Sequence, residues 1–443
     1  MRVRQLGLWV GPFRVYLVTQ AVLGFALAVS QATLIVYLVR SAHLDPFELV
    51  LLGTVLEAAY FLFQVPTGVL ADRAGRRRAV VLGFLGLGAG LVLQGSVAAL
   101  SVILAAQVVY ALGAALVDGA LEAWIADELQ DRDLGRVYTR GTLVGLLATV
   151  AGSLASALLL TVGNRVPLLA AGSLLVAFAV LLTVVMPERH FQPAQMAPPA
   201  GRTIITRLLA EVTDQVGATS RAVRQVTGLL LVLAVVFFVG GWSESFDRLW
   251  GAFLLRDVGL PSGGRFGEGL LFGLLAAASA LLALGATEIA RRRTERLGST
   301  SVLVTLLVTL GLVAAGVVVF ATASTVLVAV PAYLAVSALR PVYRPLLTLW
   351  IVERVEPAHR ATALSTRDLF DSCGQILGGP LIGLVGTLAT VRAALLCGAA
   401  AFIPATALLA LANTQVTSNT ASAEAGGPKR DRTSRGRPRR PFR

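Results

Sequence analysis

The chain has 443 residues, of which 56% are hydrophobic and only 14% are charged, and its mean hydropathy is +0.76. A soluble domain carries about 25% charged residues, so this composition excludes an ordinary soluble protein and predicts an all-α integral membrane protein. The formal net charge of +13 would suggest a nucleic-acid partner in a soluble protein, but in a membrane protein the placement of the charge matters more.

Twelve apolar segments are long enough to cross a bilayer, since a spanning helix needs about 20 residues. In chain order they cover residues 14–40, 46–71, 79–99, 101–126, 140–163, 165–186, 227–256, 268–290, 301–322, 324–352, 363–388 and 390–412. The first follows Arg2 and Arg4, but its apolar run from Val15 to Val39 exceeds the ~7–15 residues of a signal-peptide core. We therefore expect it to be an uncleaved span.

The longest internal connection divides the spans six and six. Residues 1–186 form the predicted N-terminal half, 187–226 a cytoplasmic central loop with an amphipathic stretch at Thr203–Val216, and 227–412 the C-terminal half. Residues 413–443 contain eight Lys or Arg and are rich in Gly, Pro, Ser and Thr, which predicts a disordered basic cytoplasmic tail. We expect a solvated tail near anionic lipid and no nucleic-acid partner; binding of nucleic acid or of another partner by the tail is the alternative.

The arginines predict the orientation of the spans. With both termini in the cytoplasm, most of the 38 Lys and Arg residues fall on the cytoplasmic side. Few lie in the outside loops: Arg40, Arg165, Arg256, Arg265 and Arg392. The positive-inside rule favours this orientation, and we expect the chain to be a multi-pass protein of the plasma (inner) membrane.

The two halves repeat one another. Leu121–Asp127 aligns with Leu347–Glu353 around a shared Trp-Ile pair, and the same shift carries Gly152 onto Gly378. The fourth span therefore repeats as the tenth and the fifth as the eleventh. Repeated six-helix halves of this kind place a substrate site near the midplane, between the halves.

Between the second and third spans lies a run that we call the signature loop, residues 68–78, which reads GVLADRAGRRR. Its defining positions are Gly68, Asp72, Arg73, Gly75, Arg76 and Arg77. The run resembles the signature loop of the major facilitator superfamily, a family of secondary transporters that work by alternating access. Together with twelve spans in two pseudo-symmetric halves and a long central loop, the resemblance extends over residues 1–412.

The resemblance implies roles for the residues of the loop. Asp72 would accept hydrogen bonds at the N-terminus of the eleventh span, near Arg360–Ser365, and so latch the cytoplasmic face shut. Arg76 or Arg77 would pair with an acid at the foot of the fourth span, for which Asp127 is the candidate. The alternative is that these arginines only anchor the topology.

Within the superfamily, the chain most resembles drug/proton antiporter-like efflux proteins, with two departures. Those proteins usually carry an Arg in the fourth span, where this chain has Gln107. Their fifth span usually ends its glycine pattern with Gly-Pro, whereas no Pro follows Gly152 here, and a Gly-Pro occurs instead at Gly379-Pro380 in the eleventh span.

Two carboxylates lie within the fourth span. Asp118 and Glu122 are four residues apart and would share one face of a continuous helix. Two close carboxylates in a low dielectric cannot both ionise easily, so one should hold a proton near neutral pH and release it when a cationic substrate binds. Alternatively, both acids form fixed pairs with arginines.

The internal repeat aligns Asp118 with Arg344 of the tenth span, which lies one turn after Arg340. We expect these groups to face one another across a central cavity.

The seventh and second spans supply further candidates. Glu244 and Arg248 are spaced to neutralise each other, which leaves Asp247 over. Trp242 and Trp250 of the same span would stack on a flat or cationic substrate or anchor the helix at the interface.

The second span contains Glu57, which is either a second proton site or a member of a structural pair. Glu288 and Asp371 are expected to be structural.

No nucleotide-binding loop, soluble catalytic domain or metal constellation is visible in the sequence, and Cys373 and Cys397 lie in apolar runs. We therefore expect no enzymatic activity and no cofactor, with energy drawn from a gradient, most simply of protons.

The first hypothesis for the function is proton-coupled efflux of amphiphilic or cationic drug-like compounds. The second is proton-linked uptake of a small, possibly anionic metabolite, and a remote third is a non-transporting membrane sensor. The expected partners are a small-molecule substrate, protons and the lipid bilayer, and the resemblance implies a monomer.

Overall fold

The computed structural model describes residues 11–130, 133–192, 228–259, 264–297, 300–355 and 357–425. Over these ranges the chain forms helices joined by short connections, without any strand. Twelve helical segments are long and apolar enough to cross a membrane. The prediction of an all-helical membrane fold with twelve spans is confirmed.

The first six spans come from eight helices. They are α2 (Pro12–Gln31), α3 (Leu34–Arg40), α4 (Pro46–Ala74), α5 (Arg76–Ser96), α6 (Leu100–Val117), α7 (Ala120–Leu129), α8 (Leu134–Val162) and α9 (Val166–Val185). Helices α2 and α3 together make the first span, and α6 and α7 make the fourth.

The second six spans are also interrupted in places. Their elements are α11 (Leu229–Phe253), the π-helical turn η1 (Leu254–Val258), α12 (Gly264–Leu297), α13 (Thr300–Thr322), α14 (Val326–Leu339), the 3-10 turn η2 (Arg340–Val342), α15 (Tyr343–Arg354), the 3-10 turn η3 (Pro357–His359), α16 (Arg360–Leu388), α17 (Val391–Ala400) and α18 (Phe402–Ala425). The tenth span comprises α14, η2 and α15. Helix α18 continues past Asn413, where we expected the tail to begin.

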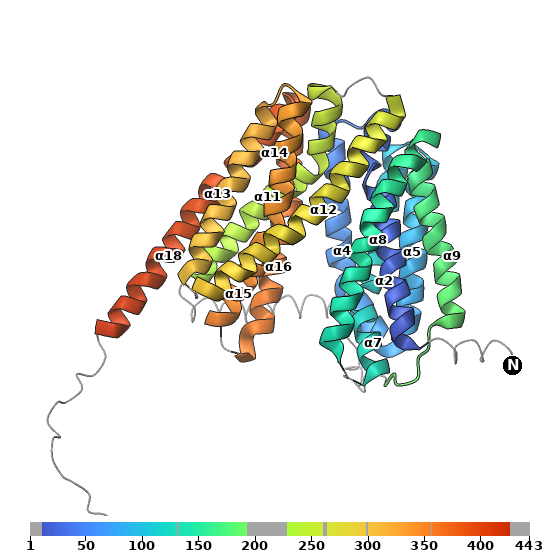
Figure 1. The fold of residues 1–443 in the computed structure, drawn as a ribbon, viewed down its shortest axis with the longest axis horizontal. Coiled ribbons are helices and arrows are strands. Elements are labelled where there is room, and N and C mark those ends of the chain that lie inside the picture. Colours follow the sequence, from blue (N-terminus) through green and yellow to red (C-terminus); the bar gives the residue numbers. More distant parts are fainter. Residues whose placement is uncertain are drawn as a thin grey trace, which may run out of the picture.

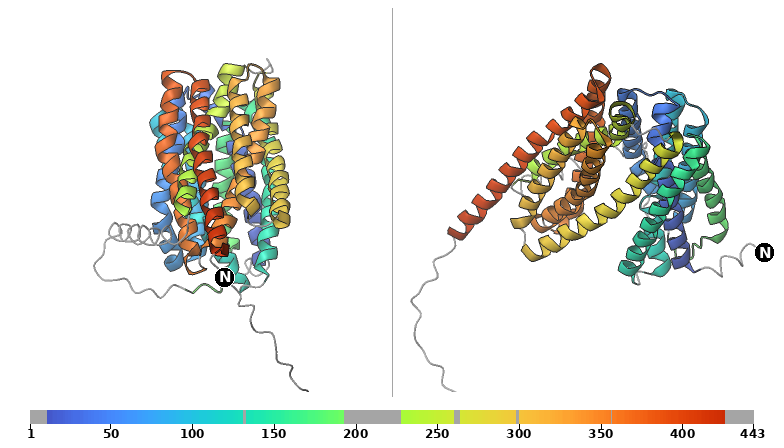
Figure 2. Two further views of the ribbon diagram at one scale, coloured as in Figure 1. Left: turned by 90° about the vertical axis from the view of Figure 1, so that its left-hand side faces the viewer. Right: turned by 45° about the horizontal axis from the view of Figure 1, so that its top comes forward.

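The helices form two bundles that meet at one end and separate at the other (Figures 1 and 2). Helices α2 to α9 make one bundle and α11 to α18 the other (Figure 1). The bundles diverge at the end that contains α7 and α15, which is also the end of the signature loop. We call this the signature-loop end and the other the closed end.

Polar contacts join the bundles at the closed end. Arg40 at the end of α3 forms an ion pair of 2.7 Å with Glu268 of α12. The guanidinium of Arg256 donates a 2.6 Å hydrogen bond to the carbonyl oxygen of Leu44. The backbone N–H of Phe47 donates a 2.9 Å hydrogen bond to the hydroxyl of Thr387 in α16. These contacts hold the second and first spans of one bundle against three elements of the other.

The start of α4 at this end is fixed by its local sequence. The Asp45 side chain accepts a 2.8 Å hydrogen bond from the N–H of Glu48, whose side chain accepts one of 2.9 Å from the N–H of Asp45. This reciprocal capping box satisfies two of the N–H groups that a helix leaves open at its start. Pro46 takes the first helical position, where its missing N–H costs nothing.

The internal repeat predicted from the sequence recurs in the packing. Gly152 of α8 lies against the backbone of Phe25 in α2, and Gly378 of α16 lies against the backbone of Gly241 in α11. Repeat-related glycines thus serve equivalent close helix contacts, between the fifth and first spans and between the eleventh and seventh. The absence of a Cβ allows the paired backbones to approach.

The outer surface of both bundles is apolar. Large hydrophobic side chains remain exposed there, among them Leu147, Val162, Leu327 and Leu388. A water-soluble protein seldom leaves apolar patches of this extent uncovered. Contact with lipid acyl chains accounts for them, because helices satisfy their own backbone polar groups and need only an apolar exterior in the bilayer.

Parts of the chain for which we made predictions lie outside the described residues. The central loop is described only as far as Gln192, so the amphipathic stretch Thr203–Val216 falls beyond it, as do the last residues of the tail, 426–443.

Candidate functional site

A cavity of about 1670 Å³ lies between the two bundles. Its walls come from α4 and α6 on one side and from α11, α14, η2, α15 and α16 on the other, with Gln31 of α2 also contributing. The contacts of the closed end lie at one end of the cavity, and the bundles diverge toward the other (Figure 1). Most of the ionisable residues predicted for a central site line it: Glu57, Asp118, Glu244, Asp247, Arg248, Arg340 and Arg344.

The wall of the first bundle has two carboxylates. The phenolic O–H of Tyr60 in α4 donates a short hydrogen bond to Asp118, which joins the second and fourth spans. Glu57 lies one turn before Tyr60 on α4. No Arg, Lys or His side chain of the described residues lies within ion-pair distance of Glu57 or Asp118. Tyr110 of α6 also lines this wall, which therefore combines aromatic and acidic side chains.

The fourth span breaks at the cavity, which corrects one prediction. Helix α6 ends at Val117 and α7 begins at Ala120, with Gly119 at φ 72° between them. A positive φ suits glycine, which has no Cβ to clash. Because the helix is not continuous, Asp118 and Glu122 do not share a face. Glu122 is exposed on α7 and is absent from the cavity wall, so the expected carboxylate pair does not form.

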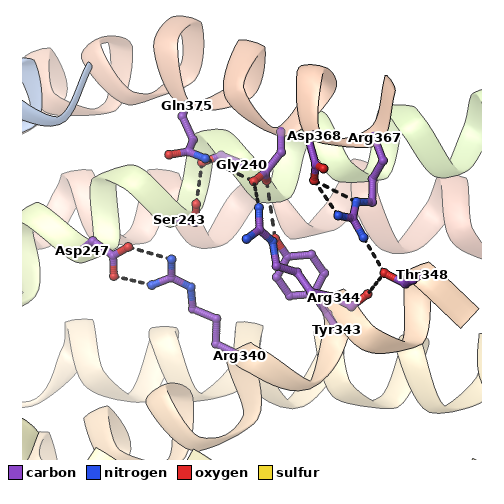
Figure 3. Close-up of polar contacts among 11 residues, drawn as sticks. Gly240, Ser243, Asp247, Arg340, Tyr343, Arg344, Thr348, Arg367, Asp368 and Gln375 are labelled. Carbon is purple, nitrogen blue, oxygen red and sulfur yellow. Dashed lines mark hydrogen bonds and ion pairs between the residues drawn. The ribbon is translucent and has the colours of Figure 1, made fainter. Parts of the chain in front are cut away.

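The wall of the second bundle contains four ion pairs. Arg248 bonds Glu244 within α11 at 2.8 Å, which confirms the pairing predicted from their spacing. Three further pairs join Arg340 to Asp247, Arg344 to Asp371 and Arg367 to Asp368. Figure 3 shows Asp247 facing the guanidinium of Arg340 and Arg367 reaching both Asp368 and Thr348.

The arginines of the tenth span do not meet Asp118, contrary to expectation. The Arg344 Nη2 atom lies 2.8 Å from Asp371 Oδ2, so Arg344 pairs within its own bundle although it lines the same cavity as Asp118. Arg340 is held twice, by Asp247 and by the face of Trp242, whose ring centre lies 5.6 Å from the guanidinium. It sits in η2, where the span is interrupted next to Pro341.

Sequence reasoning missed several residues of this wall. We expected Asp371 to be structural, and Arg367, Asp368 and Tyr343 were not considered; all four line the cavity. A usable signal existed, because the eleventh span has a mean hydropathy of only 1.2, the lowest of the twelve. Polar residues in a span mark a face that is turned away from lipid.

The two tryptophans of the seventh span have different surroundings. Trp250 lines the cavity and stacks on Tyr333, with ring centres 4.0 Å apart. Trp242 is buried against Phe246 and Phe402 and is not part of the cavity wall. Of the pair, Trp250 is therefore available to a ligand.

The signature loop forms one of its predicted contacts. Arg76 Nη1 lies 2.8 Å from Asp127 Oδ2, and the same nitrogen donates a 2.5 Å hydrogen bond to the carbonyl oxygen of Ala123. The predicted pairing of Arg76 with the foot of the fourth span is confirmed. Arg77 instead contacts the end of the sixth span and the residues just after it, since its N–H donates to Glu188 at 2.9 Å and its guanidinium donates to the carbonyl of Thr183.

The predicted cap by Asp72 is not formed in this conformation. The Asp72 side chain is 57% exposed and approaches Arg76 only to 4.0 Å, and α16 begins without a side-chain cap. The bundles are apart at this end (Figure 1), which removes the N-terminus of α16 from reach. Gly68 and Arg73 are likewise exposed.

Comparison with known proteins identifies the family. The Major Facilitator Superfamily model matches residues 16–365. The chain belongs to the major facilitator superfamily. An uncharacterised MFS-type transporter of Bacillus subtilis (strain 168), YxaM, is 22% identical over 365 residues, which cover 82% of this chain and 87% of that protein. This member of the superfamily is therefore a secondary transporter and not an enzyme.

Solved structures of other transporters share the fold of this superfamily member. The nucleoside transporter NupG has a TM-score of 0.70 at 15% identity, covering 90% of this chain and 98% of that one. A bacterial homologue of the human lysosomal transporter Spinster, in an inward-facing and unoccupied conformation, has a TM-score of 0.68 at 18% identity, covering 92% and 98%. At these identities the likeness concerns the fold alone. Among the described residues, no three His, Cys, Asp or Glu side chains gather closely enough to hold a metal ion.

Proposed function

We propose that the protein is a proton-coupled exporter of amphiphilic or cationic small molecules. The observation that carries the proposal is the wall of α4 and α6, where Glu57 and Asp118 face the cavity without a cationic partner among the described residues. Ionisable groups at bilayer depth are costly unless they serve a pathway or are neutralised. Protons and cationic substrates would compete for such carboxylates, which is the basis of antiport.

The proposed orientation places the signature-loop end in the cytoplasm. Arg73, Arg76, Arg77 and Arg78 lie at this end, and an excess of basic residues marks the cytoplasmic side of membrane proteins. Both termini would then be cytoplasmic, in a protein of the plasma (inner) membrane. The cavity would be accessible from the cytoplasm in this conformation.

Alternating access would exchange one set of contacts for another. The halves predicted at residues 1–186 and 227–412 would rock as units within a monomer. Closing the signature-loop end would bring Asp72 to the N-terminus of α16. At the opposite end, the pair of Arg40 and Glu268 would have to separate.

Proton-linked uptake of a small anion is the second candidate. The side chain of Arg344 is 55% exposed although its partner Asp371 is only 6% exposed. A guanidinium has more N–H donors than one carboxylate uses, so Arg344 retains donors for an anion entering the cavity.

The test of the proposed function measures protons and substrate together. Purified protein in liposomes containing a pH-sensitive dye receives cationic dyes in one series and small carboxylates in another. Antiport predicts that protons leave the lumen as a cation enters. Asp118→Asn should reduce this signal at least tenfold, whereas Glu122→Gln, the same change of charge in the same span but outside the cavity, should retain it.

Two results would contradict the proposal. Protons that enter the lumen together with a carboxylate would favour uptake. Equal coupling in Asp118→Asn and the wild type would remove Asp118 from the proton pathway.

A further inference from the structure

The charged groups of the cavity divide unequally between its two walls. Ten ionisable acidic and basic residues line it: the acids are Glu57, Asp118, Glu244, Asp247, Asp368 and Asp371, and the bases are Arg248, Arg340, Arg344 and Arg367. With every group ionised, the acids exceed the arginines by two.

The arginines are all neutralised within the second bundle. Each has its own carboxylate: Glu244 for Arg248 at 2.8 Å, Asp371 for Arg344 at 2.8 Å, Asp368 for Arg367 at 2.6 Å, and Asp247 for Arg340 through two hydrogen bonds. Both members of each pair lie on α11 or on the elements from η2 to α16. This wall therefore contributes no net charge.

The two excess carboxylates are Glu57 and Asp118, both on the first bundle. The charged groups that act on Glu57 are Glu244 and Arg248 of α11, Asp371 of α16 and Arg344 of α15, and both of those arginines are already paired. Tyr60 connects the two carboxylates, since it lies one turn after Glu57 on α4 and its hydroxyl bonds Asp118.

Uncompensated negative charge at bilayer depth is unfavourable, so each excess carboxylate binds either a proton or a cation. We propose that Glu57 and Asp118 together hold two exchangeable positive charges and that the substrates are organic cations whose binding releases as many protons as they have charges. A monocation displaces one proton and a dication displaces two, each proton passing from a carboxylic acid to the solvent. The exchange is then electroneutral for both classes. This inference rests on the proposed proton coupling.

The aromatic groups of the cavity indicate organic cations instead of metal ions. Tyr60 and Tyr110 lie on the same wall of the cavity as the carboxylates, and Phe246, Trp250 and Tyr333 lie on the opposite wall. A cation held over aromatic faces gains up to about 2 kcal/mol when it is desolvated. The cavity of about 1670 Å³ also has room for a molecule far larger than a hydrated ion.

The test counts protons released on binding to the purified full-length protein in weakly buffered detergent solution at pH 6 and pH 7. Two permanently charged probes, which cannot themselves exchange protons, are compared: the monocation tetraphenylphosphonium and the dication methyl viologen. Bound probe is measured in parallel by equilibrium dialysis. At a pH at which both Glu57 and Asp118 are protonated in the free protein, the expected release is one proton per bound monocation and two per bound dication.

Variants assign the protons to residues. Glu57→Gln and Asp118→Asn should each lower the release by one proton for the dication, and the double variant should release none. Glu57→Asp, which keeps the carboxylate, should restore release if Glu57→Gln fails to fold. Glu122→Gln should match the wild type.

Three results would overturn the inference. These are equal proton release with both probes, unchanged release in the folded double variant, and failure of folded wild-type protein to bind either probe. If liposomes show proton-coupled cation export while release does not follow probe charge, the proposed function stands and only the two-charge inference is wrong. Absence of proton-coupled transport removes the proposed function itself.

Discussion

Among single residues, Tyr60 has the most direct influence on Asp118, because its hydroxyl donates the hydrogen bond described for the Asp118 side chain. A hydrogen bond from a phenolic O–H fixes the position of the carboxylate oxygen that accepts it. Tyr60 thus orients Asp118 for a bound cation without contributing charge.

Removal of this hydroxyl should weaken cation binding. A hydrogen bond to a charged group contributes about 1.5–3 kcal/mol, so Tyr60→Phe should raise the Kd of a monocation at least tenfold. Equilibrium dialysis measures the change. Tyr37→Phe is the matched control, because it removes a buried hydroxyl that donates to the carbonyl of Gln94 at 2.6 Å, away from the cavity. It should lower thermal stability and leave the Kd unchanged. Equal Kd values for Tyr60→Phe and the wild type would show that Tyr60 does not act on the bound cation.

Three helices meet at the closed end of the cavity, around the ion pair of Glu244 and Arg248. A Cβ on Gly53 of α4 would overlap Glu244 Oε1 and lie 2.5 Å from Arg248 Nε, and one on Gly379 of α16 would lie 3.3 Å from Glu244 Cγ. The pair is almost fully buried, with 5% of the Glu244 side chain and 18% of the Arg248 side chain exposed. Gly53 of α4 thus leaves the space that this ion pair occupies where the two bundles meet.

Gly53→Ala should therefore hinder closure at this end. The added methyl group cannot be accommodated without displacing both members of the ion pair, so we expect the protein to favour a conformation in which α4 and α11 are apart. Transport should fall at least tenfold, and a cysteine placed in the cavity should react faster with impermeant reagents applied from the closed end. Gly311→Ala is the control, since its methyl group would meet no atom within 4 Å. Glu244→Asp, which shortens the acid, should partly rescue Gly53→Ala. Normal labelling and transport in Gly53→Ala would mean that the pair shifts at little cost.

Element by element, the sequence predicted what depends on local spacing. The twelve spans follow from apolar length, and the pairing of Glu244 with Arg248 follows from one helical turn. The pairing of Arg344 with Asp371 joins two helices whose relative rotation no spacing specifies. The break between α6 and α7 at Gly119 could not be predicted from the sequence either, because a glycine in an apolar run is compatible with a continuous helix. The failure of Asp118 and Glu122 to share a face follows from this break.

At the scale of the whole molecule, the relative position of the two bundles decides which contacts exist. Asp72 is predicted to act only when the signature-loop end is closed, and that end is open in the structure (Figure 1). A sequence specifies the contacts of both conformations but not which conformation is populated. The contact of Asp72 could therefore be predicted, but not whether it is formed in this structure.

The ion pair of Arg40 and Glu268 offers a test of the equilibrium between conformations. Their side chains are 48% and 16% exposed, and an exposed pair contributes about 0.2–1 kcal/mol. Arg40→Glu should thus shift the population toward opening of the closed end by about 1.4–5-fold. The measurement is the labelling rate of a cavity cysteine from that side. Arg40→Glu combined with Glu268→Arg should return the rate to that of the wild type; a rate that stays high in the double variant would show that the pair is not the cause.

The confinement of all four arginine pairs to the second bundle has a kinetic consequence. When the bundles rock, each pair moves as a unit, so no ion pair inside the cavity has to be broken on the way to the other conformation. The activation barrier for the conformational change therefore does not include the cost of separating these paired charges. The ion pair of Arg40 and Glu268 at the closed end does have to separate. Salt weakens the attraction between such exposed charges, with a screening length of about 10 Å at 0.1 M salt. Added salt should therefore speed departure from the conformation seen here and leave the return step almost unchanged.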